Sequence, residues 1–433
     1  MNTSAVTPRS LNPSGTYELV RLGYVARLQN GLTVDAKRDV TGDVVTSPYL
    51  RVANVQAGSL DLESVTEITV PRSVARRSTL RPGDVLMTEG GDLDKLGRGT
   101  VWQGELDQCL HQNHIFAVRP DPQRLSGRFL AYVTQSLYAR HYFESTGTKT
   151  TNLASTNSSK IQSFPLLLPS LEEQRRIADF LDSETARVDR MATIRRQQID
   201  LLGSSEASVI SEYLESTAGT PTRVKHLATR ITSGPRGWGD LVTDQGSLFL
   251  RITNVPRRGI TLDLDDSLYV TAPSGPERER SRTRPGDVLV SITADIGSVA
   301  IVDDRATDAN ISQHVAMVRP DQSSCNPTWL AYAIKSARSN QFLRMNSYGG
   351  TKVGLGLGDV ANLAIEVPDV RTQEQSASRI TRTLVQRENL RRRMIVQRAL
   401  LAERRQALIT AAVTGQFDVC TASGRNVTDG VSA

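Results

Sequence analysis

Two stretches of the chain carry a narrow apolar stripe with a period close to seven residues. The first covers residues 171–214, between Pro169 and Pro221, and is otherwise polar and charged. The second covers residues 371–414. A seven-residue apolar period predicts a long helix whose stripe packs against another helix. The stripe residues are Ile177, Leu181, Val188, Met191, Ile194, Leu202 and Val209 in the first stretch, and Ile380, Leu384, Met394, Leu401 and Leu408 in the second.

A helix over residues 171–214 would be ~65 Å long at ~1.5 Å per residue, which exceeds the width of a small domain. Two such helices in one chain either pair with each other or lie on unrelated surfaces. We expect them to pair as an antiparallel coiled coil, because the sequence around them is repeated as well.

The sequence before the first stripe mixes two kinds of apolar pattern. Short apolar runs bounded by Gly, Pro and Asp predict strands at residues 49–55, 115–118 and 164–169. Helical spacing predicts one helix over residues 127–142. We therefore expect an α/β domain of the mixed α+β kind. The apolar residues with helical spacing are Phe129, Leu130, Val133, Leu137 and Tyr138.

The same order of motifs begins again after residue 218, at offsets of 200 to 203 residues, for example from 51 to 251 and from 81 to 284. Ordered matches at a nearly constant offset indicate a tandem duplication of one domain-plus-helix unit. The material between the matches differs, as expected for two domains of one fold with different specificity. The paired motifs are Arg-Val-Ala-Asn-Val at 51–55 with Arg-Ile-Thr-Asn-Val at 251–255, Arg-Pro-Gly-Asp-Val-Leu at 81–86 and 284–289, the His-containing segments 112–121 and 312–321, Leu-Ala-Tyr at 130–132 and 330–332, Gly-Thr-Lys at 147–149 and 350–352, and Glu-Gln at 173–174 and 374–375.

The duplication sets the predicted domain boundaries. We expect a disordered lead at 1–14, a first domain at 15–170, a central long helix at 171–218, a second domain at 219–370, a C-terminal long helix at 371–416 and a disordered tail at 417–433.

Charge, cysteine spacing and the lack of long apolar runs limit which kinds of partner and which cellular compartment we expect. The net charge of +6 and pI of about 9.3 permit a nucleic-acid partner without requiring one. Cys109, Cys325 and Cys420 share no close spacing, so neither a disulfide framework nor a zinc site is indicated. The N-terminus lacks a signal-peptide pattern, and no run of 18 apolar residues predicts a membrane span. We therefore expect a cytoplasmic protein without a membrane partner.

Four segments carry a resemblance to a known family. They are the strand-Pro-Leu-x-Glu-Gln-x-x-Ile segment at 164–177, its counterpart at 372–375, the C-terminal Glu-Arg-Arg-Gln-Ala-Leu-Ile-Thr-Ala-Ala-Val-Thr-Gly-Gln at 403–416, and the Gly-rich segment 89–99. With the duplication, they resemble the specificity subunit of type I restriction–modification systems over residues 15–418. The second half departs from the family pattern, because Arg371-Thr372-Gln373 replaces the expected Pro-Leu-x start.

The resemblance implies two target-recognition domains, each reading one half of a split duplex DNA sequence, with the paired helices as a spacer. It further implies that the helices dock two copies of a methyltransferase subunit, which transfers methyl from S-adenosylmethionine to adenine N6. Motor/nuclease restriction subunits that use ATP can join the complex. The specificity subunit itself would bind no cofactor and catalyse nothing.

The catalytic motifs missing from the sequence also favour a protein without catalytic activity. Amino-methyltransferases need an Asn/Asp-Pro-Pro-aromatic tetrad, and Asn326-Pro327-Thr328-Trp329 lacks the second Pro. The chain has no Gly-x-x-x-x-Gly-Lys-Ser/Thr loop for a motor ATPase. His111 and His114 could suggest a metal, but a site needs three or four ligands and only His314 recurs in the second copy. We therefore expect a buried, hydrogen-bonded histidine at the repeated position.

DNA contacts are expected from cations near glycines and in polar loops, because Lys and Arg bind phosphates and glycine allows a close backbone approach. For each residue a solvated surface charge is the alternative. The candidates are Lys95, Arg98, Lys149 and Lys160 in the first domain, and Arg236, Trp238, Arg257, Arg258 and Lys352 in the second.

The sequence thus predicts a DNA-recognition subunit that reads a bipartite site, with half-sites ~10 bp apart from centre to centre, and scaffolds a methyltransferase complex. The alternative is a coiled-coil adaptor with two divergent protein-binding domains and no DNA readout. A stand-alone nuclease or methyltransferase is disfavoured by the missing motifs.

Overall fold

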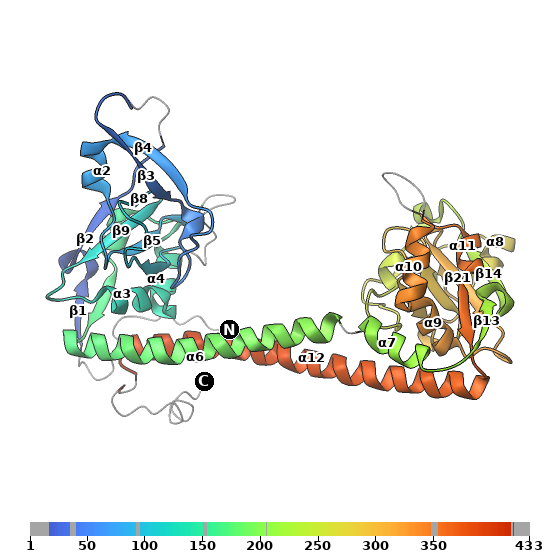
Figure 1. Ribbon diagram of the computed structural model, residues 1–433. Helices are drawn as coiled ribbons and strands as arrows, with labels where there is room; N and C mark the ends of the chain where they lie inside the picture. Colours follow the sequence, from blue (N-terminus) through green and yellow to red (C-terminus); the bar gives the residue numbers. More distant parts are fainter. Residues whose placement is uncertain are drawn as a thin grey trace. The chain divides into compact units, whose positions relative to one another are not determined.

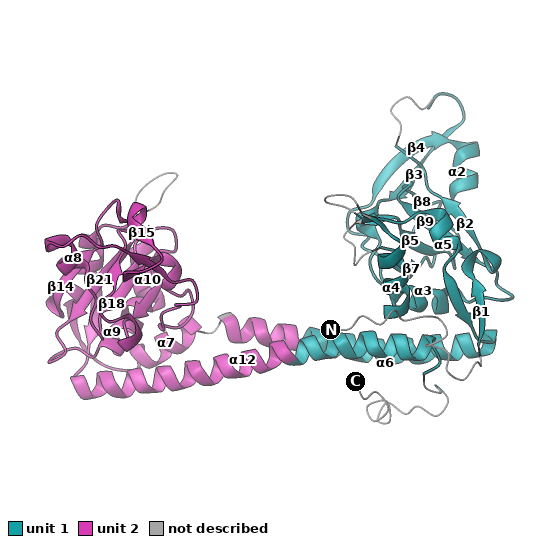
Figure 2. Ribbon diagram, turned by 180° about the vertical axis from the view of Figure 1, so that it is seen from behind, with its two compact units in different colours: residues 1–194, 397–433 teal, residues 195–396 magenta. Residues whose placement is uncertain are grey.

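The computed structural model describes residues 17–34, 40–91, 96–149, 154–204, 206–347, 354–416 and 419. The predicted lead at 1–14 and nearly all of the predicted tail lie outside these ranges. Two compact units emerge, residues 1–194 with 397–433 as unit 1 and residues 195–396 as unit 2 (Figure 2). The boundary cuts through both long helices, so each unit contains one globular domain and a portion of each helix.

The domain of unit 1 is built mainly on antiparallel strand pairs, although β3 and β8 are parallel (Figure 1). Its central sheet has the order β2-β9-β5-β7, with every neighbouring pair antiparallel. A second sheet has the order β4-β3-β8, and β1 pairs with β12. The strands are β1 (Glu18–Arg21), β2 (Ala26–Asn30), β3 (Val44–Leu50), β4 (Thr66–Pro71), β5 (Val85–Thr88), β7 (Gly99–Val101), β8 (Leu110–His111), β9 (Ile115–Pro120) and β12 (Pro165–Leu168).

The helix predicted over 127–142 is two helices, α3 (Gly127–Gln135) and α4 (Leu137–Thr146). Ser136 between them is extended, with ψ of 154°, and its side chain accepts a hydrogen bond from Ala139 N. A serine at a helix N-cap interrupts the preceding helix in this way. The spacing of the apolar residues is the same with or without the break, so it could not predict it. Two shorter helices, α2 (Arg72–Ser78) and α5 (Ser158–Gln162), complete the domain.

Unit 2 repeats this architecture, as the duplication predicted. Its central sheet has the order β14-β21-β18-β19, the counterpart of β2-β9-β5-β7. A second sheet has the order β15-β17-β16-β20, and β13 pairs with β22. The elements are β13 (Thr220–Arg223), β14 (Ala228–Ser233), β15 (Val242–Thr243), β16 (Ser247–Leu250), β17 (Leu268–Val270), β18 (Val288–Ser291), β19 (Val299–Ile301), β20 (Asn310–Ile311), β21 (Val315–Pro320), β22 (Ala364–Val367), α8 (Pro276–Ser281), α9 (Pro327–Lys335), α10 (Ala337–Met345) and α11 (Leu357–Asn362).

A buried ion pair explains one of the repeated motifs. In unit 1, Arg119 on β9 donates two hydrogen bonds to Asp84, at 2.7 and 2.6 Å. In unit 2, Arg319 donates to Asp287 in the same way, at 2.8 and 2.7 Å. Both carboxylates are 1% exposed, and a buried carboxylate needs such a partner. The repeated Arg-Pro-Gly-Asp motif is therefore scaffold.

The long helices are α6 (Leu171–Ser204), α7 (Glu206–Glu215) and α12 (Val370–Val413). Within unit 1, the first turns of α6 and the last turns of α12 share one core, which contains Ile177, Leu181 and Leu408. Within unit 2, Ile210 of α7 and Ile380 of α12 share another core. The pairing is therefore antiparallel in each unit, as predicted. In the described residues, no helix is both long enough and apolar enough to cross a membrane.

The predicted stripe divides into two groups by burial. Its ends are buried in the domain cores and its middle is only partly covered. The buried members are Ile177, Leu181, Val188, Val209, Ile380 and Leu408, the half-buried ones are Met191, Leu202, Leu384, Met394 and Leu401, and Ile194 is exposed.

The structure corrects the register of the repeat at the start of the second long helix. Sequence comparison pairs Gln174 with Gln375, but Gln375 is exposed. Instead, Gln373 repeats the bonds of Gln174. The Oε1 atom of Gln174 accepts from Ser126 N and its Nε2 donates to Arg124 O and Pro169 O, at 2.8 to 2.9 Å.

Gln373 Oε1 accepts from Asn326 N at 2.8 Å, and its Nε2 donates to Pro368 O and Ser324 O at 2.9 and 3.3 Å. Like Gln174, it is 0% exposed. The two glutamines hold the turn before α3 or α9 against the first turn of α6 or α12. The segment Arg371-Thr372-Gln373, which differs from the family pattern, therefore still supplies the buried glutamine. This glutamine lies two positions before Gln375, where the sequence comparison placed it.

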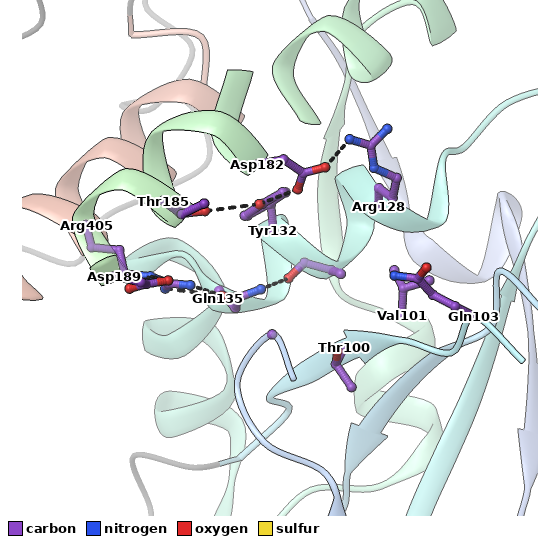
Figure 3. Close-up of a pocket in the computed structure, with 13 residues that line it drawn as sticks. Thr100, Val101, Gln103, Arg128, Tyr132, Gln135, Asp182, Thr185, Asp189 and Arg405 are labelled. Carbon is purple, nitrogen blue, oxygen red and sulfur yellow. Dashed lines mark hydrogen bonds and ion pairs between the residues drawn. The ribbon is translucent and has the colours of Figure 1, made fainter. Parts of the chain in front are cut away.

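In unit 1, a polar network joins α3 to both long helices around a cavity of about 400 Å³ (Figure 3). Tyr132 on α3 donates to Asp182 at 2.6 Å, and Arg128 bonds the same carboxylate. Arg405 of α12 lies 3.1 Å from Asp189 of α6. The network fixes α3 against the helix pair through directional bonds, and burial together with Asp182 raises the pKa of Tyr132 to about 12.

Candidate nucleic-acid interface

In unit 1, a small sheet joins two loops that lie far apart in the sequence. Strand β11 (Ala154–Ser155) pairs with β10 (Thr148–Lys149) on one side and with β6 (Gly90–Gly91) on the other. Gly90 and Gly91 of the Gly-rich segment therefore lie beside Ala154 and Ser155 of the polar segment. Sequence reasoning chose cations in both segments without predicting that they meet.

Two of the predicted cations can be placed within this junction. Lys149 lies on β10 opposite Ala154. Lys160 is half-buried, and its Nζ donates to Thr148 Oγ1 at 2.9 Å. Lys95 lies outside the described residues.

Arg98 follows Gly97, whose φ of +67° and contact with Phe143 leave no room for a Cβ. The Arg98 side chain is half-buried, and its carbonyl accepts from Thr88 N at 3.2 Å. The glycine thus allows the loop to fold back close to β5, and it sets the position from which the Arg98 side chain leaves the backbone.

The turn between β8 and β9 closes the same junction. Glu89 N donates to His114 O at 2.9 Å, and Thr156 N donates to Glu89 O at 2.8 Å. The ring of His114 is exposed, with Nδ1 2.5 Å from the carboxylate of Glu89. We call the three segments tied by these bonds, 88–91, 112–115 and 154–156, the loop junction of unit 1.

The expectation of a buried histidine at the repeated position is wrong. His114 and His314 are both exposed, because each follows the last buried residues of a short strand and sits in the turn. His111 is the buried one, and burial lowers its pKa. Across the described residues, no group of three His, Cys, Asp or Glu side chains could hold a metal ion.

Unit 2 contains the same junction at equivalent backbone positions. Ile292 N donates to His314 O at 3.1 Å, and Leu355 N donates to Ile292 O at 2.8 Å. We call these segments, 291–293, 312–315 and 354–356, the loop junction of unit 2. Lys352, the predicted contact in the neighbouring loop, lies outside the described residues.

The loop after β14 carries two more predicted contacts. Gly234 packs so closely on Ile311 O that a Cβ would overlap it, and this fixes the start of the loop. Arg236 is exposed. Trp238 is 4% exposed and packs with Phe249 and Val270 in a small core. The prediction that Trp238 contacts DNA is therefore corrected, because its ring is buried in this small core.

Arg257 and Arg258 lie at a cavity of about 490 Å³ in unit 2, between the loop after β16 and α7. Arg257 Nε donates to Asp295 at 2.8 Å, and this bond raises the pKa of Arg257. Lys335 is buried at the same cavity, with its Nζ 2.9 Å from Arg257 O and 3.8 Å from Glu206, and burial lowers its pKa. Arg258 is exposed and is the stronger contact candidate of the two arginines.

Comparison with known proteins decides the family. Residues 15–200 and 279–390 match the family described as the type I restriction modification DNA specificity domain. The chain belongs to this family. It is therefore related to proteins that confer DNA specificity, and the two matched stretches fall in the two copies of the repeat.

Curated specificity subunits of this family are distant relatives. The chain is 22% identical to the EcoKI specificity subunit of Escherichia coli, over 86% of this chain and 82% of that one. It is 19% identical to the EcoBI specificity subunit of Escherichia coli, over 86% and 80%. The putative MjaX specificity subunit of Methanocaldococcus jannaschii is 20% identical, and this match spans 49% of the chain and only 48% of that relative.

Solved structures share the fold. A chain from a structure on complex assembly and conformational transition of the type I R-M system has a TM-score of 0.74 at 19% identity, covering 93% of this chain and 98% of that chain. The HsdS subunit from Thermoanaerobacter tengcongensis has a TM-score of 0.59 at 18% identity, covering 93% and 97%. The predicted fold, two similar mixed α/β domains with two long antiparallel helices, is confirmed.

Sequence reasoning on this specificity-domain chain missed the exposed histidine of each loop junction. The signal was present, because His114 and His314 belong to a repeated motif. Repetition alone does not separate scaffold from function, since the repeated Asp84 and Asn54 are buried. Exposure of the ring is what distinguishes the histidine.

Proposed function

We propose that this chain is the DNA-recognition subunit of a type I restriction–modification complex, and that each loop junction faces one half of a bipartite duplex site. The observation that carries the proposal is the repeated junction. The two units have the same pair of backbone hydrogen bonds in the junction. These bonds link residue 114 to 89 and 89 to 156 in unit 1, and residue 314 to 292 and 292 to 355 in unit 2. The side chains of the junction differ, with Glu89 in one unit and Ile292 in the other. A common frame with different side chains suits two domains that bind one kind of polymer and read different bases.

The cations around the junctions support phosphate binding. In unit 1 these are Arg98, Lys149 and Lys160, and in unit 2 they are Arg236 and Arg258. Lysine and arginine on phosphates supply a large share of the affinity of a DNA-binding protein and make it salt-dependent. Lys95 and Lys352 remain predicted contacts in the neighbouring loops.

The long helices are proposed to scaffold partner subunits. Large apolar side chains remain exposed along the described parts of α6 and α12, which favours a protein partner over solvent. We propose two methyltransferase subunits there, with restriction subunits joining them. The exposed side chains are Ile194, Leu201, Val385, Leu390, Ile395, Val396 and Leu400.

The chain is proposed to be non-catalytic and to act in the cytoplasm. S-adenosylmethionine would be bound by the methyltransferase subunits and ATP by the restriction subunits. The missing tetrad and the missing phosphate-binding loop in the sequence support this assignment.

The first test is a map of modified adenines in the native host, with and without the gene for this chain. We expect methylation at one split motif with a fixed gap to disappear when the gene is deleted and to return with the wild-type gene. An unchanged map in a host whose methyltransferase partner is expressed would refute the proposal.

A second test separates DNA recognition from the adaptor alternative. Binding of the full chain, with its methyltransferase partner, to labelled duplex should weaken steeply with salt, whereas an apolar protein interface should not. Lys160→Ala should reduce the slope of log affinity against log salt by ~1. Arg124→Ala is the matched control, because Arg124 is exposed beyond the other end of β9, ~20 Å along the strand from the junction.

A further inference from the structure

The repeated polar side chains mostly perform the same structural task in both units. Asp84 and Asp287 bind the arginine of the neighbouring strand. Asn54 and Asn254 accept the backbone N–H three residues earlier and donate to a loop carbonyl. Each of these side chains is at most 2% exposed, so burial and hydrogen bonding explain why both copies keep it.

The repeated histidines do not fit this explanation. Both rings are exposed, and their recorded partners differ. His114 Nδ1 lies 2.5 Å from Glu89, whereas His314 Nε2 lies 3.1 Å from the amide of Gln313. The residue equivalent to Glu89 is Ile292, which cannot pair with a ring. A contact within the domain that the two copies share therefore does not account for the histidine.

The backbone nevertheless holds both histidines in the same kind of turn. Each turn is closed by a bond back to its first residue, Ile115 N to Gln112 O at 2.9 Å and Val315 N to Ser312 O at 3.1 Å. The carbonyl of each histidine also accepts a hydrogen bond from a backbone N–H. The donor is Glu89, directly after β5, in unit 1 and Ile292, directly after β18, in unit 2. What the two units share is thus the position of an exposed imidazole at the centre of the loop junction.

We propose that His114 and His314 each donate a hydrogen bond to a phosphate of the DNA, one in each half-site, and so seat both domains on the duplex in the same way. This inference rests on the proposed function. An identical side chain in two domains that read different half-sites carries no information about bases, whereas phosphate contacts set register without reading sequence. An imidazole that uses one nitrogen for its neighbour keeps the other for a ligand when its protonation state makes that nitrogen a donor.

The neighbouring cations fit this assignment in unit 1. Glu89, whose carboxylate binds the His114 ring, begins the segment that leads to β6, and β6 lies two strands from Lys149. Lys160 is tied to Thr148 on the same sheet. The segment bonded to His114 therefore leads into the same small sheet that carries Lys149 in its backbone and binds the side chain of Lys160.

The test uses the full chain with its methyltransferase partner and two labelled duplexes, one with the split motif from the methylation map and one of random sequence. His114→Ala should weaken binding to both duplexes by the same factor, about twofold to tenfold if the ring is neutral and more than about tenfold if it is charged. His114→Gln, which keeps a donor near Nε2, should recover most of the loss. His141→Ala is the control, since His141 is exposed in the same unit and the second copy has Gln341 at that place.

Phosphate-ethylation interference then locates the contact. We expect His114→Ala to lose interference at one phosphate in one half-site, and His314→Ala to lose it at one phosphate in the other. Unchanged affinity and interference in both variants would overturn the inference, and so would a loss confined to the target duplex, which indicates base reading. If the wild-type complex binds neither duplex, the proposed function fails before the histidines are tested.

Discussion

The corrected register at the start of α12 leads to a sharp prediction for Gln373→Ala. The side chain accepts from one buried backbone N–H and donates to two carbonyls. Its removal leaves three backbone groups without that partner, and an unsatisfied buried group costs ~1–3 kcal/mol. The bond to Ser324 O is long, at 3.3 Å, so we assign it the smallest share. The expected loss in the free energy of unfolding of unit 2 is about 3–5 kcal/mol.

Gln375→Ala is the matched control, two residues further along the same helix. Gln375 is the residue that sequence comparison pairs with Gln174, yet it is exposed. Replacing an exposed helical glutamine by alanine changes stability by no more than ~0.5 kcal/mol. The two variants therefore separate the register seen in the structure from the one read from the sequence.

The assay is urea unfolding followed by tryptophan fluorescence in a Trp102→Phe background. The chain has three tryptophans, and Trp238 and Trp329, the two that remain, both lie in unit 2. At ~2–4 °C per kcal/mol for a unit of this size, thermal melting should fall by roughly 6–20 °C in Gln373→Ala. Equal destabilisation by the two variants, or a change below about 1 kcal/mol in Gln373→Ala, would refute the reasoning.

Further predictions concern buried charge, thiol reactivity and DNA affinity. Asp84→Ala removes one half of a buried ion pair and should cost ~3–5 kcal/mol in urea unfolding, whereas Asp43→Ala, from an exposed pair, should cost less than ~1 kcal/mol; similar losses would contradict this. Burial raises the pKa of Cys109 and of Cys325 to about 12, so the reactive thiolate is scarce at pH 8 and alkylation of the native chain, measured residue by residue by mass spectrometry, should be far slower than in urea. Labelling at the unfolded rate would disprove it. Arg236→Ala should weaken binding to target and random duplexes equally and reduce the salt slope by ~1; an effect on the target alone would point to base reading.

The family and the layout of the fold could be predicted because they depend on repetition and period. The apolar stripe from Ile177 to Val209 identifies its helix by spacing alone. The paired motifs identify the duplication without any knowledge of contacts. The break at Ser136 was missed, because a single N-cap serine interrupts a helix without changing the apolar pattern around it.

The candidate site was predictable only in part. Cations near glycines mark the loops, and Lys149 and Lys160 do lie at a junction of loops. Trp238 was misjudged because a tryptophan beside glycine and arginine has the same sequence signature whether its ring points outward or inward. The repeated histidine was undervalued for the converse reason, since a repeated residue is usually scaffold.

By itself, the sequence determined the tandem duplication, the two long helices and membership of the specificity-domain family, since these follow from patterns along the chain. Only the tertiary structure decided that Gln373 rather than Gln375 repeats Gln174, that His114 is exposed, and that segments 88–91 and 154–156 meet. The physical reason is that these features depend on hydrogen bonds and packing between residues far apart in sequence. Neither local spacing nor residue type specifies which of two nearby side chains makes such a contact.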